Sequence, residues 1–122
     1  MNKGRKISGG KYHANRKKKF YELTNQEKIV LLGDSKRKTI RIRGGNKKII
    51  LLNTNIANIS DPSTKKIQKS EIKNVLETPQ NKFLARQNRL MKGVIIETSL
   101  GKARITNRPS REGSVNAVLL SE

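Results

Sequence analysis

The sequence predicts a mainly β protein, in which a small antiparallel β-barrel-like body with one short helix follows an extended basic N-terminal arm. Short apolar segments recur about every ten residues between turn signals, a spacing typical of small barrels and sandwiches. Val, Ile, Leu and Phe are also unevenly distributed, with three in residues 1–27 and 28 in residues 28–122. The chain therefore divides into an arm at residues 1–21, which cannot bury a core, and a body at residues 22–122.

The arm is predicted from its charge. Residues 1–21 contain eight Lys and Arg and no acidic residue, so their side chains repel one another. We expect this segment to be disordered in the free protein and to fold on an anionic partner; the alternative is a solvated tail without function. Tyr12 can stack on an unpaired base while the neighbouring cations hold phosphates. Phe20 and Tyr21 can either stack in the same way or attach the end of the arm to the body.

Two strands joined by a tight turn are predicted at the start of the body. Residues 38–43 alternate between isoleucine and polar side chains, as in a strand with one buried face. Residues 49–52 form a continuous apolar run, which suits a strand covered on both faces or a barrel wall. Between them, Gly44 and Gly45 precede an asparagine and can adopt positive φ, which indicates a tight turn. The same turn is a cationic loop tip whose bare backbone can approach a phosphate closely.

The middle of the body has weaker signals. Residues 56–59 predict a short strand that ends in a turn at residues 60–63. Residues 65–76 fit either one face of a helix or two short strands. Thr78 followed by Pro79 matches an N-cap and a first helical position, so a short helix is expected to follow and to end near Met91.

The predicted helix has two stripes. Its apolar stripe is expected in the core and comprises Phe83, Leu84, Leu90 and Met91. Its cationic stripe fits a solvated face better than a binding surface and comprises Lys82, Arg86 and Arg89.

The C-terminal part has the clearest β signal. Residues 94–98 and 102–106 predict a hairpin with a glycine-containing loop, because apolar and polar residues alternate in its second strand. Residues 107–113 are expected to form a loop that contains two arginines and a proline. Residues 115–120 predict a last strand.

Charge and composition narrow the functional class. The chain has 28 Lys and Arg against 9 Asp and Glu, a net charge of +19 that a polyanion would neutralise. Runs of at most four Ile, Leu or Val residues are too short for a membrane span or a signal peptide, and no cysteine or N-terminal glycine can carry a lipid. Without cysteine, and with His13 as the only histidine, we expect no metal site and no His-based catalytic site. The prediction is a nucleic-acid-binding protein without enzymatic activity, cofactor, metal, small-molecule substrate or membrane partner.

Several motifs resemble a known family. They are Ser-Gly-Gly at 8–10, Arg-Lys-Lys-Lys-Phe-Tyr-Glu-Leu at 16–23, Ile-Arg-Gly-Gly-Asn-Lys-Lys at 42–48, Leu-Glu-Thr-Pro-Gln-Asn at 76–81, Gly-Val-Ile-Ile-Glu-Thr-Ser-Leu-Gly-Lys-Ala-Arg-Ile-Thr at 93–106 and Asn-Ala-Val-Leu-Leu at 116–120. Together they cover nearly the whole chain and resemble small-subunit ribosomal protein eight of the archaeal and eukaryotic "e" type, in its compact archaeal form.

This resemblance implies a β-barrel-like body bound to small-subunit ribosomal RNA, with the arm extended into the RNA and residues 65–76 in a strand. It also implies a structural role in the cytoplasmic ribosome, with neighbouring ribosomal proteins as further candidate partners. Two other functions compete with this one. Charge alone permits a non-specific, chromatin-like DNA-binding protein, whereas the scattered positions of the nine acidic residues argue against a nucleic-acid-processing enzyme.

The candidate RNA-binding residues are the cations and the turn glycines, on which phosphate contacts are expected, together with Tyr12 and His13 of the arm. They are Lys3, Arg5, Lys6, Lys11, Tyr12, His13, Arg16, Lys17, Lys18, Lys19, Lys36, Arg37, Lys38, Arg41, Arg43, Gly44, Gly45, Lys47, Lys48, Arg104, Arg108 and Arg111.

Overall fold

The computed structural model describes residues 4–13, 15–23 and 27–120. In chain order its elements are the short 3₁₀ turn η1 (Phe20–Glu22), β1 (Leu31–Leu32), β2 (Lys36–Arg41), the turn η2 (Arg43–Gly45), β3 (Lys47–Thr54), β4 (Ile56–Ser60), β5 (Ile67–Glu77), α1 (Lys82–Arg86), β6 (Ile95–Thr98), β7 (Gly101–Ile105), α2 (Pro109–Glu112) and β8 (Asn116–Leu119). Within these described ranges, no helix is long and apolar enough to cross a membrane.

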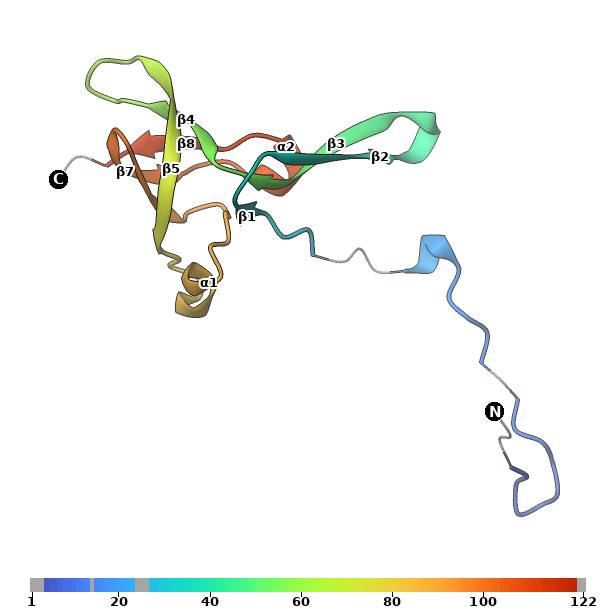
Figure 1. Cartoon of the computed structure of the whole chain (residues 1–122). Helices are drawn as coiled ribbons and strands as arrows, with labels where there is room; N and C mark the ends of the chain where they lie inside the picture. Colours follow the sequence, from blue (N-terminus) through green and yellow to red (C-terminus); the bar gives the residue numbers. More distant parts are fainter. Residues whose placement is uncertain (1–3, 14, 24–26, 121–122) are drawn as a thin grey trace.

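Strands β4 to β8 form a closed barrel, which confirms the predicted mainly β fold (Figure 1). Neighbouring strands are antiparallel except for β4 and β8, which pair in parallel with Asn58 opposite Asn116. The exception has a geometric cause, because five strands that alternate in direction around a ring must leave one parallel pair. The side-chain amide of Asn58 donates to the side-chain oxygen of Asn116 across this pair at 3.0 Å.

The core lies inside the barrel and depends on regular alternation along the strands. In β7, Ala103 and Ile105 are buried while Lys102 and Arg104 point outward, as the sequence predicts. Strand β5 settles the ambiguity at residues 65–76, because it is one long strand rather than a helix or two short strands. Its pairing with β6 shifts register twice, which explains why its apolar residues do not alternate.

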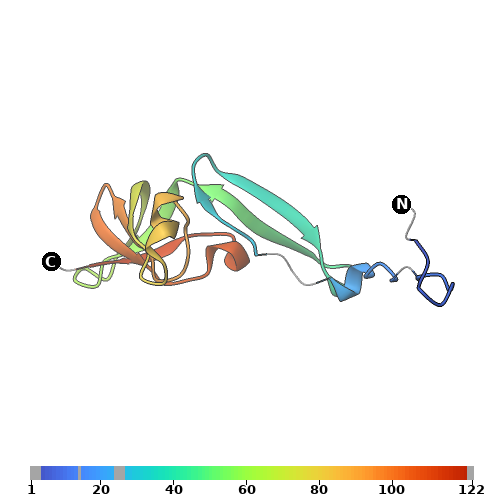
Figure 2. The same cartoon turned by 90° about the horizontal axis from the view of Figure 1, so that it is seen from below.

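A second, three-stranded sheet with the order β1-β3-β2 adjoins the barrel. Strands β2 and β3 pair antiparallel as a hairpin, which Figure 2 shows projecting from the barrel. At the base of the hairpin, Ile50 is 5% and Leu51 is 1% exposed, so opposite faces are covered there, as the apolar run predicts. At its tip, Gly44 and Gly45 have φ angles of 78° and 80°, and the Ile42 N–H donates to the Asn46 carbonyl at 2.8 Å. The predicted tight turn is therefore confirmed.

The helix predicted after Thr78 is wrong in its start and its length. Strand β5 continues to Glu77, and the Asn81 N–H donates to the Thr78 carbonyl in a turn, so the helix begins only at Lys82. Asn81 caps it by accepting from the Phe83 N–H at 3.0 Å. The helix ends at Arg86, only five residues long.

The core predicted for this segment is correct only in part. Leu90 is buried beyond the end of α1, and Met91 packs partly buried against the core. Leu84 is half-buried. Phe83, however, is 69% exposed, so this member of the predicted apolar stripe is not in the core.

The loop predicted at residues 107–113 contains a second short helix, α2. It begins at Pro109, ends at Glu112 and is capped by Gly113, whose φ angle is 76°. This is the pairing of N-terminal proline and C-terminal glycine that favours a helix. A proline at the first helical position, which was expected to mark a helix start at Pro79, therefore marks one at Pro109 instead. Helix α2 packs against β3, at the base of the projecting hairpin.

The N-terminal segment runs away from the barrel (Figure 1). Arg5 and Lys11 form a β-bridge that closes a turn, and the described side chains of this segment are mostly exposed. Tyr21 is 71% exposed, so it does not attach the arm to the body as one alternative proposed. The side chain of Phe20 lies outside the described part of the structure.

Candidate nucleic-acid interface

The hairpin of β2 and β3 concentrates positive charge. Residues 36–48 contain seven Lys and Arg and no acidic residue. Strand pairing places Arg41 directly opposite Lys47, with their Cβ atoms on the same face about 5 Å apart. Like charges in this arrangement destabilise a sheet. Among the described residues, none of the seven forms an ion pair, so the repulsion is not relieved within the part of the chain that is described.

The tip of the hairpin is open. A Cβ atom built on Gly44 or Gly45 meets only the ends of side chains, Asn46 Nδ2 at 3.9 Å and Arg41 Nη2 at 4.0 Å. Both glycines therefore leave their backbone accessible between the charged ends of β2 and β3. This geometry agrees with the close approach of a phosphate that the sequence suggests.

The first part of the arm is organised around its own turn. The Arg5 guanidinium donates to the Gly9 carbonyl at 3.0 Å. The Lys6 Nζ atom lies 5.7 Å from the centroid of the Tyr12 ring, a distance typical of a cation–π interaction. Tyr12 remains half-exposed and next to a cation, an arrangement in which a base could stack on the ring.

The second part of the arm forms an ion pair with Glu22, the first residue after it. The Arg16 guanidinium donates to both oxygens of Glu22, at 2.8 and 3.1 Å, and the Lys19 backbone N–H donates to the same carboxylate at 2.9 Å. These contacts hold the pKa of Glu22 below its usual range, and the hydrogen bonds from Arg16 contribute most. A phosphate must therefore compete with Glu22 for Arg16, whereas Lys17 and Lys18 are exposed and form no such pair with a described residue.

Predicted residues near the C-terminus lie at two places. Arg104 is exposed on the outer wall of the barrel. Arg108 and Arg111 flank or belong to α2, which brings them to the base of the hairpin. Glu112 lies beside them. A hydrogen bond from the Asn107 amide and a weaker contribution from the Arg108 N–H lower the pKa of Glu112. The helix therefore adds both cations and an ionised carboxylate to this region.

The structure thus gathers the predicted residues into an arm group, a hairpin group and a smaller group at α2. Lys3 lies outside the described residues, and Lys48 is half-buried. Every other predicted cation is exposed, as is His13. The structure describes no cluster of His, Cys, Asp and Glu side chains that could hold a metal ion.

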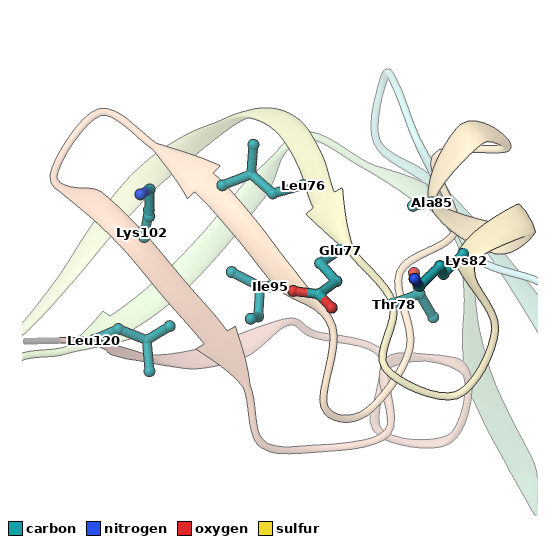
Figure 3. A pocket seen from close by; sticks show the side chains of 8 residues that line it. All are labelled: Leu76, Glu77, Thr78, Lys82, Ala85, Ile95, Lys102 and Leu120. Carbon is teal, nitrogen blue, oxygen red and sulfur yellow. The ribbon is translucent and has the colours of Figure 1, made fainter. Parts of the chain in front are cut away.

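Sequence reasoning missed a groove of about 590 Å³ between α1 and the outside of the barrel (Figure 3). Its apolar lining includes Leu76, Ile95 and Leu120, and Thr78 lies at its edge next to α1. The buried Thr78 hydroxyl has no hydrogen-bond partner among the described atoms. Leu76 is displaced from the regular alternation by a register shift in β5, and no sequence pattern predicts such a shift.

Fold and charge together define a small basic β-barrel protein with two cationic extensions, an arm and a hairpin. A family model described as "Ribosomal protein S8e" matches residues 1–120. The small ribosomal subunit protein eS8 of Methanocorpusculum labreanum is 45% identical over 116 residues, which cover 95% of this chain and 93% of the relative. The protein of the same name from Sulfolobus acidocaldarius is 41% identical over 122 residues, or 99% of this chain and 95% of the relative.

The chain therefore belongs to the ribosomal protein S8e family. This membership confirms the resemblance drawn from the motifs. It also confirms the prediction of a small-subunit ribosomal protein of the cytoplasm that is not an enzyme.

Proposed function

We propose that this protein binds small-subunit ribosomal RNA, as a structural constituent of the ribosome, through its arm and its basic hairpin. The observation that carries the proposal is the hairpin, where seven cations stand together without an ionic partner among the described residues. A free protein gains nothing from opposing Arg41 and Lys47 across a sheet. RNA phosphates between these side chains would turn the repulsion into attraction and release counterions.

The barrel and the extensions have separate tasks in this function. The closed barrel is a rigid base with an apolar core, and it holds the hairpin through Leu51. The arm, residues 1–21, lacks a core of its own and becomes ordered along the RNA backbone. Its cations then contact phosphates, while Tyr12 stacks on an unpaired base. Phosphate contacts position the protein, and RNA shape supplies the specificity.

A salt titration of binding to small-subunit ribosomal RNA fragments tests the contribution of the arm. Deleting residues 1–20 should lower the log–log slope of affinity against salt by about three to six, because each lost phosphate contact removes about 0.7 to 0.9. The truncated protein should keep weaker binding through the hairpin. If the slope is the same with and without the arm, the arm does not provide the main electrostatic contact.

Two controls make this experiment specific. Tyr12→Ala should lower affinity with almost no change in slope, because stacking releases no counterions. Duplex DNA at matched salt serves as the competing ligand. Equal affinity for duplex DNA and for folded ribosomal RNA would favour the non-specific DNA-binding alternative.

A further inference from the structure

The outer wall of the barrel differs from the projecting hairpin in its charge. Strands β5 to β8 together contain four Lys and Arg against three Glu, a net charge of +1. Residues 36–48, which include β2 and the hairpin tip, carry +7. The wall also pairs an acid with a base, because Glu97 stands opposite Lys102. Its charge is thus nearly balanced within the protein, and it does not require a polyanion.

The groove between α1 and this wall is apolar, although the outer face of a small barrel is usually polar. Leu76 is 40% and Leu120 is 39% exposed, and the half-buried Ile95 lines the same groove (Figure 3). Its volume of about 590 Å³ falls within the range of ligand-binding clefts. Apolar side chains that gather in one hollow, rather than singly over a surface, mark a binding site.

Polar groups surround this apolar centre. Figure 3 shows Lys82 and Lys102 at opposite ends of the groove, with Glu77 between them. An apolar centre inside a polar rim is the usual pattern of a protein–protein interface. Thr78 lines the groove next to α1, and its buried hydroxyl has no hydrogen-bond partner among the described atoms. A hydrogen-bonding group at this end of the groove would remove the cost of that unsatisfied hydroxyl.

A protein segment matches this chemistry better than RNA does. Unpaired bases stack on aromatic rings or on arginine planes, and among the described residues that line the groove none is aromatic and none is an arginine. The Glu77 carboxylate would also repel a phosphate. An aliphatic or aromatic side chain from a protein fits the apolar lining, and a carboxylate beside it would be attracted to Lys82 and Lys102.

The groove is also built from motifs that the proposed RNA contacts do not use. Leu76, Glu77 and Thr78 belong to the motif at residues 76–81, which resembles the family. Other lining residues come from the motifs at residues 93–106 and 116–120. None of the lining residues is among the predicted RNA-binding residues, so these motifs contain a surface that RNA binding leaves unexplained.

We propose that this groove binds a segment of a neighbouring protein of the small ribosomal subunit. An apolar side chain of that segment rests on Leu76, Ile95 and Leu120, and a carboxylate next to it faces Lys82 or Lys102. The surface is separate from the arm and the projecting hairpin. The chain would thus contact RNA through its cationic extensions and protein through its barrel wall.

Site-directed crosslinking in assembled small subunits tests the proposal. The chain has no cysteine, so a single introduced cysteine can carry a photo-crosslinker at one defined position. Arg86→Cys places it one turn beyond Lys82 on α1, next to the groove but outside its lining. Lys47→Cys places it on the projecting hairpin for comparison. Each labelled full-length protein is assembled with ribosomal RNA and the other subunit proteins, and its adducts are identified by mass spectrometry.

The label at position 86 should react with a segment of another protein that contains both an apolar and an acidic residue, whereas the label at position 47 should react with RNA. Adding Leu76→Glu to Arg86→Cys should reduce the protein adduct about tenfold per incorporated chain, because it places a charge in the apolar contact. Ile67→Glu is the matched control, since Ile67 also lies on β5, is 73% exposed and is outside the groove. It should leave the adduct unchanged. Amide exchange in β6 and β7 should be the same in both variants, which shows that the barrel remains folded.

Four results overturn the inference. Adducts of the label at position 86 with RNA, or with a second copy of this chain, would assign the groove to a different occupant. No adduct at all would mean that the groove faces solvent. An adduct that Leu76→Glu leaves unchanged would mean that the neighbour contacts α1 and not the groove. Failure of the proposed RNA binding is a separate result, because it would remove the RNA adduct at position 47 whatever the label at position 86 contacts.

Discussion

Two of the protein's antiparallel hairpins differ in the charges that stand opposite each other across the strands. In the hairpin of β6 and β7, Glu97 is opposite Lys102, so the outward face pairs an acid with a base. In the hairpin of β2 and β3, Arg41 is opposite Lys47. Opposite charges across a strand pair stabilise it, and like charges destabilise it. The first hairpin is thus suited to stability within the free protein, and the second to a partner that supplies negative charge.

Burial follows the same division. In the barrel hairpin, Ile96 and Ala103 stand opposite each other and are completely buried. In the projecting hairpin, Thr39 stands opposite the exposed Ile49. The free energy of folding therefore comes mainly from the barrel. The projecting hairpin depends on its turn, its backbone hydrogen bonds and its anchor at Leu51.

The largest expected effect is the difference in unfolding free energy between an Ile→Ala substitution in the barrel and one in the projecting hairpin. Ile96→Ala should lower the free energy of unfolding by about 2 to 5 kcal/mol, because it leaves a cavity in the closed core. Ile42 lies at the end of the projecting hairpin and is 39% exposed, so Ile42→Ala should lower the free energy of unfolding by less than about 1 kcal/mol. Urea unfolding of both variants measures the difference. Equal losses would mean that the hairpin tip shares a cooperative core with the barrel and that the two regions do not differ in their contribution to stability.

The barrel hairpin could be predicted from sequence because its two faces have different environments. The interior receives Ala103 and Ile105 and the solvent receives Lys102 and Arg104, so burial leaves a period of two in the sequence. Strand β5 left no such pattern. Its two register shifts insert extra residues, so its apolar positions fit a helix as well as a strand.

The candidate interface was predictable in composition but not in geometry. The seven cations of residues 36–48 are visible in the sequence. Their division between two faces depends on the pairing of β2 with β3, which local sequence does not determine. The helix start was missed for a related reason. Thr78 and Asn81 can both cap a helix. Because β5 extends to Glu77 and a turn follows it, Asn81 rather than Thr78 is the N-cap.

A smaller effect is expected at the tip of the projecting hairpin. Gly45 has a φ angle of 80°, so Gly45→Val should introduce about 1 to 3 kcal/mol of strain. Because the tip lies far along the hairpin, amide protection should fall in β2 and β3 and stay unchanged in β6 and β7 (Figure 2). Hydrogen exchange followed by NMR measures both. Gly45→Asn is the control and should retain most of the protection, since asparagine tolerates positive φ. A loss of protection throughout the barrel would contradict the separation of the two regions.

The smallest expected effect is a change in the pKa of Asp61, whose carboxylate accepts hydrogen bonds within the turn between β4 and β5. Asp61 follows β4 and accepts from the Thr64 hydroxyl at 2.8 Å and from the Ser63 N–H at 2.9 Å. These hydrogen bonds hold the pKa of Asp61 below its ordinary value, and the bond from Thr64 contributes most. Thr64→Ala removes the hydroxyl donor and should raise the pKa of Asp61 towards that value. Thr64→Ser keeps the donor and should leave the pKa close to that of the wild type. NMR titration of the Asp61 carboxyl group measures the pKa in all three proteins.

The direction of the effect on stability follows from this pKa. A carboxyl group whose pKa is lower in the folded than in the unfolded state stabilises the fold above its unfolded pKa. That contribution is lost as the pH falls through the folded pKa, because the carboxyl group is then protonated in both states. Thr64→Ala should therefore be slightly less stable than the wild type at neutral pH, and the part of the deficit due to Asp61 should vanish in acid. In the projecting hairpin no acidic side chain lies within residues 36–48, so charge there is balanced by a partner rather than by a turn. An unchanged Asp61 pKa in Thr64→Ala would show that the turn does not stabilise the carboxylate.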